Sequence, residues 1–205
     1  DLQNHTRKGG RNLRRLLKSV IFLAIIATLI YGGITGYNKL LTYLYPIKYS
    51  EYVEKYSKEF DVPETLIYAV IHSESTFDPL AQSQAGAKGL MQMLPDAFEW
   101  AKSRYNGESN EADIFDVETN IKYGTLILHL HYDTFGGWVE VLSAYHAGAG
   151  NVKSWLQNPD YSLDGKTINS FPSACADTEH YVNKVLKTQQ KYTELYYVTD
   201  TERTI

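Results

Sequence analysis

An uncharged run of 20 residues, SVIFLAIIATLIYGGITGYN at positions 19–38, constrains this chain more than any other feature. A helix rises 1.5 Å per residue, so the run spans roughly 30 Å, the thickness of the hydrocarbon core of a bilayer. Four basic side chains lie between positions 11 and 18, whereas only Lys39 and Lys48 follow closely. Because the cytoplasmic flank carries the excess of Lys and Arg, we expect the N-terminus inside and residues 40–205 outside.

A cleaved signal peptide is the alternative interpretation of this run. The apolar region of a signal peptide is shorter, about 7–15 residues, and ends in a small-residue cleavage site. No A-x-A site precedes Lys39, and a lipid anchor is not expected because the single cysteine, Cys175, lies far downstream. We therefore expect an uncleaved transmembrane anchor at 19–38.

The rest of the chain is acidic. Residues 40–205 hold 13 basic and 23 acidic side chains. Such a surface repels nucleic-acid phosphates, so we expect no nucleic-acid partner. One cysteine excludes an internal disulfide framework and a Cys-rich zinc site. His129 and His131 are two residues apart on an expected helix and point to different faces, so no metal site is predicted.

Helical periodicity dominates after residue 48, and strand alternation is scarce. We expect helices at 49–60, 63–75, 95–105, 117–134, 138–146, 149–157 and 177–196, with loops at 106–116 and 158–176. The sequence thus predicts a mainly α domain at 49–197. It follows a basic cytoplasmic N-terminus at 1–18, the anchor at 19–38 and a linker at 39–48, and it precedes a flexible tail at 198–205.

The sequence Asp61-Val62-Pro63-Glu64 is a strong helix start signal. Asp61 can cap the helix, Pro63 suits its first turn, and Glu64 lies three residues after the cap. The helix should run to about Ser75, because Pro79 prevents it from continuing much further.

Glu74 extends the apolar stripe of this helix. It lies three residues after Ile71, four after Val70 and seven after Ile67, so it shares their face. Burial disfavours the charged form of a carboxyl and raises its pKa. A group of that kind can deliver a proton to a leaving oxygen near neutral pH. The alternative is that Glu74, in the last helical turn, points to water.

Two later segments leave room beside a ligand. In AGAKGLMQMLP, at 85–95, glycines flank Lys88, although the phosphate-binding ending GK[ST] is missing. Glycine allows the backbone to approach a ligand closely. Residues 142–148, LSAYHAG, end a helix in small side chains around an aromatic ring.

Four segments in order resemble the catalytic domain of the soluble-lytic-transglycosylase type, a superfamily related to goose-type lysozyme. They are Glu74-Ser75 within IHSESTFDPLAQS, Gly89-Leu90-Met91-Gln92, AYHAG at 144–148 where the family has AYNAG, and EHYVNKVL with Tyr181. The stretch FDVETNIKYGTLIL at 115–128 also resembles the family's helix after the second motif, and the resemblance covers about 49–195.

The resemblance implies a lysozyme-like helical domain that cleaves the β-1,4 bond between N-acetylmuramic acid and N-acetylglucosamine in peptidoglycan, without a cofactor. Glu74 would be the sole catalytic acid and base, and the product would carry a 1,6-anhydro ring. The chain would then be a single-pass protein of the bacterial cytoplasmic membrane, with its catalytic domain on the exterior side. Its partners would be glycan strands and, through 19–38, the membrane.

The resemblance also implies substrate-binding roles. Ser75 would contact Glu74 or the substrate, the segment Gly89, Leu90, Met91 and Gln92 would line the cleft, and Tyr145 and Tyr181 would hold the acid and the sugar. His146 departs from the family's asparagine. Unlike an amide, histidine can become positively charged, and a cation near Glu74 would lower the pKa of that carboxyl.

Two other functions remain open at this point. A hydrolytic lysozyme would use the same acid but admit water to the cleft. A non-catalytic scaffold of an envelope machine would bind peptidoglycan without cutting it. Neither choice is decided by the motifs, because water exclusion depends on the cleft.

Overall fold

The computed structural model describes residues 2–105 and 113–197, with side chains from residue 16 onward. The chain separates into two compact units, Asp1–Pro46 and Ile47–Ile205. Each unit is described by itself.

The first unit is one long helix, α1 (Leu2–Leu44). Its segment Leu16–Leu44 has a mean hydropathy of 2.1, and its most apolar window is wholly unburied. These 29 residues are long enough and apolar enough to cross a bilayer, although a signal sequence near the N-terminus can also meet these two criteria. The helix continues six residues into the expected linker at 39–48, because no proline interrupts it before Pro46.

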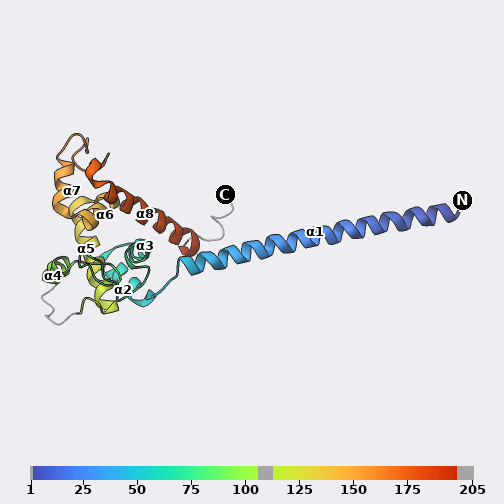
Figure 1. Ribbon diagram of the computed structural model, residues 1–205, viewed down its shortest axis with the longest axis horizontal. Coiled ribbons are helices and arrows are strands. Elements are labelled where there is room, and N and C mark those ends of the chain that lie inside the picture. The colour runs from blue at the N-terminus through green and yellow to red at the C-terminus, as the bar shows by residue number, and fades with distance from the viewer. Residues whose placement is uncertain (1, 106–112, 198–205) are drawn as a thin grey trace. The chain divides into compact units, whose positions relative to one another are not determined.

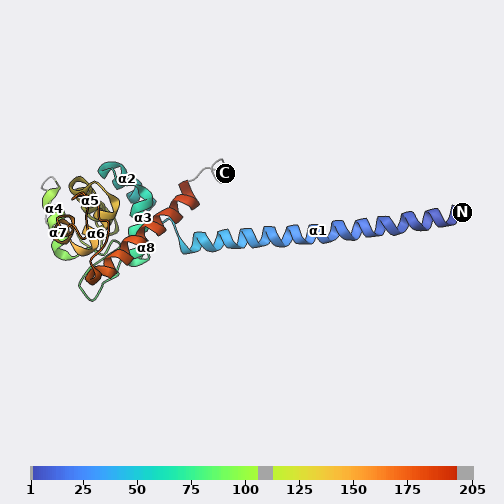
Figure 2. The same ribbon diagram turned by 90° about the horizontal axis from the view of Figure 1, so that it is seen from above.

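Helices build the described part of the second unit (Figures 1 and 2). They are α2 (Ser50–Phe60), α3 (Glu64–Ser75), α4 (Pro95–Arg104), α5 (Val117–Phe135), α6 (Trp138–Ala147), α7 (Ala149–Leu156) and α8 (Ala176–Tyr192), with a 3-10 turn η1 (Ser173–Cys175) and a terminal π-turn η2 (Thr193–Tyr197). Only isolated β-bridges, at Gln82–Lys88 and Lys88–Met93, occur among the described residues. The mainly α prediction is therefore confirmed.

The residues before α3 have other roles than the sequence analysis predicted. Asp61 does not cap α3; it adopts a left-handed conformation, with φ of 52°, that ends α2. Pro63 occupies the N-cap position with φ of −56° and ψ of 130°, and α3 begins at Glu64. Asp61 is unable to cap α3 because it already forms the turn that closes α2.

The loop predictions need smaller changes. The expected loop 158–176 contains η1 and the first residue of α8. Residues 106–112 of the other expected loop, and the expected tail 198–205, lie outside the described residues.

Helix α3 forms the centre of the core. Its residues from Leu66 to Ile71 are all buried, and it contacts α2 and, most extensively, α8. Figures 1 and 2 both show α3 and α8 side by side. Tyr68 of α3 stacks on Tyr192 of α8 with ring centroids 5.4 Å apart. This packing fixes the direction of α3 and so the position of Glu74 in its last turn.

Asn120, in the first turn of α5, holds the loop that contains the GLMQ motif. Its side chain is fully buried, and its Oδ1 accepts a hydrogen bond from Met91 N at 2.8 Å. Its Nδ2 donates to Lys88 O at 3.2 Å and to Ile114 O at 2.6 Å. One buried amide therefore satisfies three backbone groups that would otherwise lose their hydrogen bonds on burial.

Gly89 is required where the loop meets this amide. Its φ is +76°, and a Cβ there would overlap Asn120 Nδ2 and lie 2.9 Å from Ile114 O. Gly86 has a similar φ of +86°, but a Cβ at that position would meet nothing within 4 Å. The two glycines thus share a backbone conformation and differ in the space around them.

We predict that Gly89→Ala destabilises the chain more than Gly86→Ala does. Left-handed backbone strain costs about 1–2 kcal/mol in both variants, and the overlap at position 89 adds about 1–3 kcal/mol. Urea unfolding of the detergent-solubilised chain measures both losses. Equal losses of unfolding free energy in the two variants would show that Asn120 and the loop can move away from the added methyl group at no energetic cost.

Candidate active site

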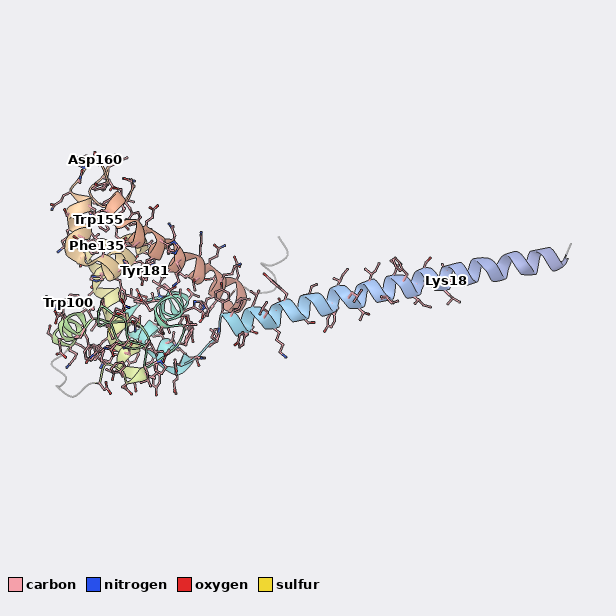
Figure 3. The ribbon with its side chains drawn as sticks, in the orientation of Figure 1. Lys18, Trp100, Phe135, Trp155, Asp160 and Tyr181 are labelled. Atoms are coloured by element: carbon pink, nitrogen blue, oxygen red, sulfur yellow. The ribbon has the colours of Figure 1, made fainter. Side chains whose placement is uncertain are left out.

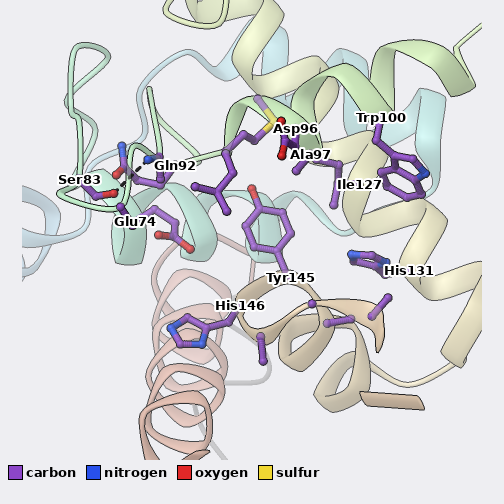
Figure 4. Close-up of a pocket in the computed structure, with 18 residues that line it drawn as sticks. Glu74, Ser83, Gln92, Asp96, Ala97, Trp100, Ile127, His131, Tyr145 and His146 are labelled. Atoms are coloured by element: carbon purple, nitrogen blue, oxygen red, sulfur yellow. Dashed lines mark hydrogen bonds between the residues drawn. The ribbon is translucent and has the colours of Figure 1, made fainter. Parts of the chain in front are cut away.

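A cleft of about 760 Å³ lies between α3, the loop after it, and helices α4 to α7 (Figure 4). Small and apolar side chains make up most of its lining, as is usual in ligand sites. Its polar and aromatic lining residues include Glu74, Gln92, Asp96, Trp100, His131, Tyr145 and His146.

Glu74 lies in the last turn of α3 and points into this cleft (Figure 4). Burial raises the pKa of its carboxyl to about 7, against smaller lowering effects from Tyr181 and Lys184. Lys184 is fixed nearby, since its Nζ donates a hydrogen bond to Ser73 O at 2.8 Å. The structure therefore favours the buried interpretation of Glu74 over the solvent-facing one.

Ser75 joins the end of α3 to the GLMQ loop. Its hydroxyl lies 2.8 Å from Leu90 O and 3.2 Å from Ile71 O. It is not among the residues that line the cleft. Its interactions therefore support the position of the loop, and a direct contact with substrate stays a prediction.

The GLMQ motif contributes mainly backbone to the site. The side chains of Leu90 and Met91 are fully buried and pack in the core. Gln92 does line the cleft, and its Nε2 donates to Ala81 O at 3.0 Å and to Gly89 O at 2.9 Å. Of the four motif residues, Gln92 is thus the one that lines the cleft.

Two tyrosines approach Glu74 from different helices. The Tyr145 hydroxyl, on α6, donates a hydrogen bond to Met91 O at 2.7 Å. Tyr181, on α8 (Figure 3), is 8% exposed and is not among the residues that line the cleft. The charge of Glu74 contributes to raising the pKa of both phenols, after the larger effect of their burial. Both tyrosines therefore lie close to the acid, and their expected roles in holding the acid and the sugar stay predictions.

His146 forms one wall of the cleft beside Glu74 (Figure 4). Its Nδ1 lies 3.1 Å from Thr178 Oγ1, and its ring stacks on Tyr181. Thr178 was not predicted from the sequence, because the pairing joins residues 32 positions apart on two helices.

One face of α5 also contributes to the site without having been predicted. Asn120, Gly124, Ile127 and His131 recur at helical spacing; the first two meet the GLMQ loop and the last two line the cleft. In the sequence, the polar Asn120 on this otherwise apolar face was the feature that could have indicated a role for α5 in the site. Burial lowers the pKa of His131 to about 4, so its ring is neutral at pH 7. The ring stacks on that of Trp100, with centroids 5.9 Å apart.

The histidines do not gather into a metal site in the part of the chain that the structure describes. No group of three or more His, Cys, Asp or Glu side chains there could hold a metal ion. His129 instead lies 3.5 Å from Asp133, one turn along α5.

Comparison with known proteins agrees with this geometry. The family model described as "Transglycosylase SLT domain" matches residues 51–168. The chain is 32% identical over 146 residues to the soluble lytic murein transglycosylase of Escherichia coli (strain K12), covering 69% of the chain and 22% of that protein. It is 30% identical over 169 residues to the membrane-bound lytic murein transglycosylase C of Edwardsiella ictaluri (strain 93-146), covering 71% of the chain and 46% of that protein.

Solved structures show the same fold. The crystal structure of the 70 kDa soluble lytic transglycosylase from Escherichia coli matches with a TM-score of 0.66 and 27% identity, over 79% of this chain and 27% of that one. The lysozyme-like helical prediction is thereby confirmed. The chain spans between about a fifth and a half of the length of these curated relatives. From the matched residues 51–168, the chain belongs to the transglycosylase SLT domain family.

Proposed function

We propose that this chain is a lytic transglycosylase that cleaves the β-1,4 bond between N-acetylmuramic acid and N-acetylglucosamine in peptidoglycan, leaving 1,6-anhydro ends. One observation carries the proposal: the Glu74 carboxyl faces the cleft with a pKa of about 7. Both of its protonation states are therefore available near neutral pH. The relatives named lytic murein transglycosylases supply the substrate class.

The proposed reaction uses Glu74 twice. Its protonated form donates a proton to the glycosidic oxygen while the bond from that oxygen to C1 of the muramic residue breaks. The resulting carboxylate then accepts the proton of the C6 hydroxyl, whose oxygen attacks the same C1 and closes the ring. Because this nucleophile belongs to the substrate, its high effective concentration replaces an activated water.

The rest of the cleft supports this role. Tyr145 is held by Met91 O, and it lies beside the carboxyl in Figure 4. Most of the cleft lining is apolar, which disfavours entry of a competing water. We infer that Gln92 and His146, two polar side chains that line the cleft with Glu74 (Figure 4), bind the sugar.

Asp96 is the observation that favours a hydrolytic alternative. Glycosidases that hydrolyse their substrate commonly need a second carboxylate, and Asp96 also lines the cleft. However, Asp96 is exposed and lies in the first turn of α4, where a negative charge is stabilised by the helix N-terminus. We therefore assign it no part in catalysis.

We further propose that residues 19–38 anchor the chain in the cytoplasmic membrane, with 1–18 in the cytoplasm and the catalytic unit outside. The apolar segment Leu16–Leu44 and the preceding basic residues support this topology. The name of one relative, membrane-bound lytic murein transglycosylase C, also supports a membrane location. Glycan strands would then reach the cleft from the wall side.

The first prediction concerns the products. Mass spectrometry of purified peptidoglycan after exposure to the detergent-solubilised chain should show anhydro-muramyl ends. Glu74→Gln removes the transferable proton and should lower turnover by at least about 1000-fold while glycan binding persists. Hydrated reducing ends would favour the lysozyme instead, and binding without any cleavage would favour the scaffold.

The second prediction distinguishes a mechanism that uses Glu74 alone from one that uses Asp96 as a second catalytic carboxylate. If Glu74 acts alone, Asp96→Asn should retain kcat within about threefold, since its carboxyl activates nothing. A second catalytic carboxylate would instead contribute about 100-fold or more, as general bases do. A loss of that size, with hydrated products, would overturn the single-acid mechanism.

The third prediction concerns pH. The first step needs protonated Glu74, so kcat/KM should fall as pH rises through about 7. Lys184 lowers the pKa of this carboxyl, so Lys184→Gln should move the fall to higher pH. Lys187→Gln makes the same change of charge at an exposed position of α8 and serves as the control. Equal profiles for the two variants would show that Lys184 does not act on the acid.

A further inference from the structure

His146 connects the end of α6 to the start of α8. Its Nδ1 lies 3.1 Å from the hydroxyl oxygen of Thr178. Its ring lies nearly flat on that of Tyr181, with centroids 4.5 Å apart and an angle of 25° between the planes. Two contacts, one polar and one aromatic, thus fix both the position and the rotation of this imidazole.

Thr178 and Tyr181 are placed to receive one ring between them. They are three residues apart on α8, so their side chains share a face of the helix. Both are buried, with exposures of 2% for Thr178 and 8% for Tyr181. Because buried side chains have little freedom, Thr178 and Tyr181 offer a fixed surface to the imidazole of His146, which is otherwise exposed.

The Tyr181 hydroxyl is directed at the acid without being locked to it. It is buried and has no partner of good hydrogen-bond geometry among the described residues, yet its proximity already lowers the pKa of Glu74. Catalytic hydrogen bonds in unliganded enzymes are often long or misaligned, and they tighten when substrate binds. A small misplacement of Tyr181 would therefore decide whether this bond forms.

We propose that His146 and Thr178 act as a positioning pair: Thr178 orients the imidazole, and the imidazole holds the ring of Tyr181 so that its hydroxyl meets the Glu74 carboxyl. This inference rests on the proposed function, in which Glu74 is the acid. It assigns Thr178 a role and makes His146 a positioning residue for Tyr181, in addition to its place in the cleft wall.

The surroundings of Glu74 make this coupling measurable. Among the described residues, the titratable and charged side chains beside Glu74 are Tyr145 and His146 from α6, and Tyr181 and Lys184 from α8. Asp96 of α4 and His131 of α5 line the same cleft. Tyr145 is held independently by Met91 O, and Lys184 by Ser73 O. Removing the imidazole should therefore disturb Tyr181 and leave the other two in place.

The test compares pH profiles of kcat/KM for the full chain in detergent micelles. Tyr181→Phe removes the hydroxyl and should move the alkaline fall to higher pH. His146→Ala should move it in the same direction and lower kcat roughly tenfold, within the hundredfold that small misplacements can cost. In the double variant the two shifts should not add, because no hydroxyl remains to be positioned.

Two further variants test separately the two contacts of the imidazole, with the ring of Tyr181 and with the hydroxyl of Thr178. His146→Phe keeps a ring against Tyr181 but loses the bond to Thr178, and Thr178→Val loses that bond with little change in shape. In both variants, the alkaline fall of kcat/KM should move to higher pH by less than it does in His146→Ala. His180→Ala, which removes an exposed histidine one residue before Tyr181, should leave the profile unchanged.

A ¹³C NMR titration of the Glu74 carboxyl gives a readout independent of turnover. The proposal predicts a higher pKa in His146→Ala than in the wild-type chain, with no further rise in the double variant. Additive shifts, or a slower His146→Ala with unchanged titration and pH profile, would overturn the positioning role. A wild-type chain that shows this coupling but cleaves nothing would contradict the proposed function and leave the pair intact.

Discussion

Loss of hydration at one carboxyl, that of Glu74, is the constraint on which the site depends. The last turn of α3 carries this group on the same face as Ile67, Val70 and Ile71, which are buried. The Glu74 side chain is half-buried where it lines the cleft, and this burial raises the pKa of its carboxyl to about 7. The same helix packing that stabilises the unit thus supplies a group that can both donate and accept a proton near neutrality.

Polar tethers then build the cleft around this acid. Ser75, Asn120 and Tyr145 come from three different helices, and each bonds to the backbone between residues 88 and 91. The loop has little regular structure of its own, so these side chains determine its path. Leu90 and Met91 fill the core beneath it, which explains why an irregular segment can form a defined wall of the cleft.

The sequence predicted most of the helices because their signals are local. Apolar spacing, Pro63 and the glycines after α5 and α6 marked the helix positions to within a few residues. Two boundaries differ from the local signals: Asp61 was assigned to the start of α3 although it ends α2, and α1 continues through residues 39–44 into the expected linker. At such boundaries two local structures are both allowed, and the surrounding structure chooses between them.

The sequence by itself determined the apolar N-terminal segment, the mainly α fold and the alignment of Glu74 with a buried helix face, since each follows from the order of neighbouring residues. Only the tertiary structure decided which side chains meet there. Thr178 beside His146, and Asn120 beside Gly89, are about 30 residues apart along the chain. No periodicity within one helix records such pairs, because they arise only when separate helices pack together.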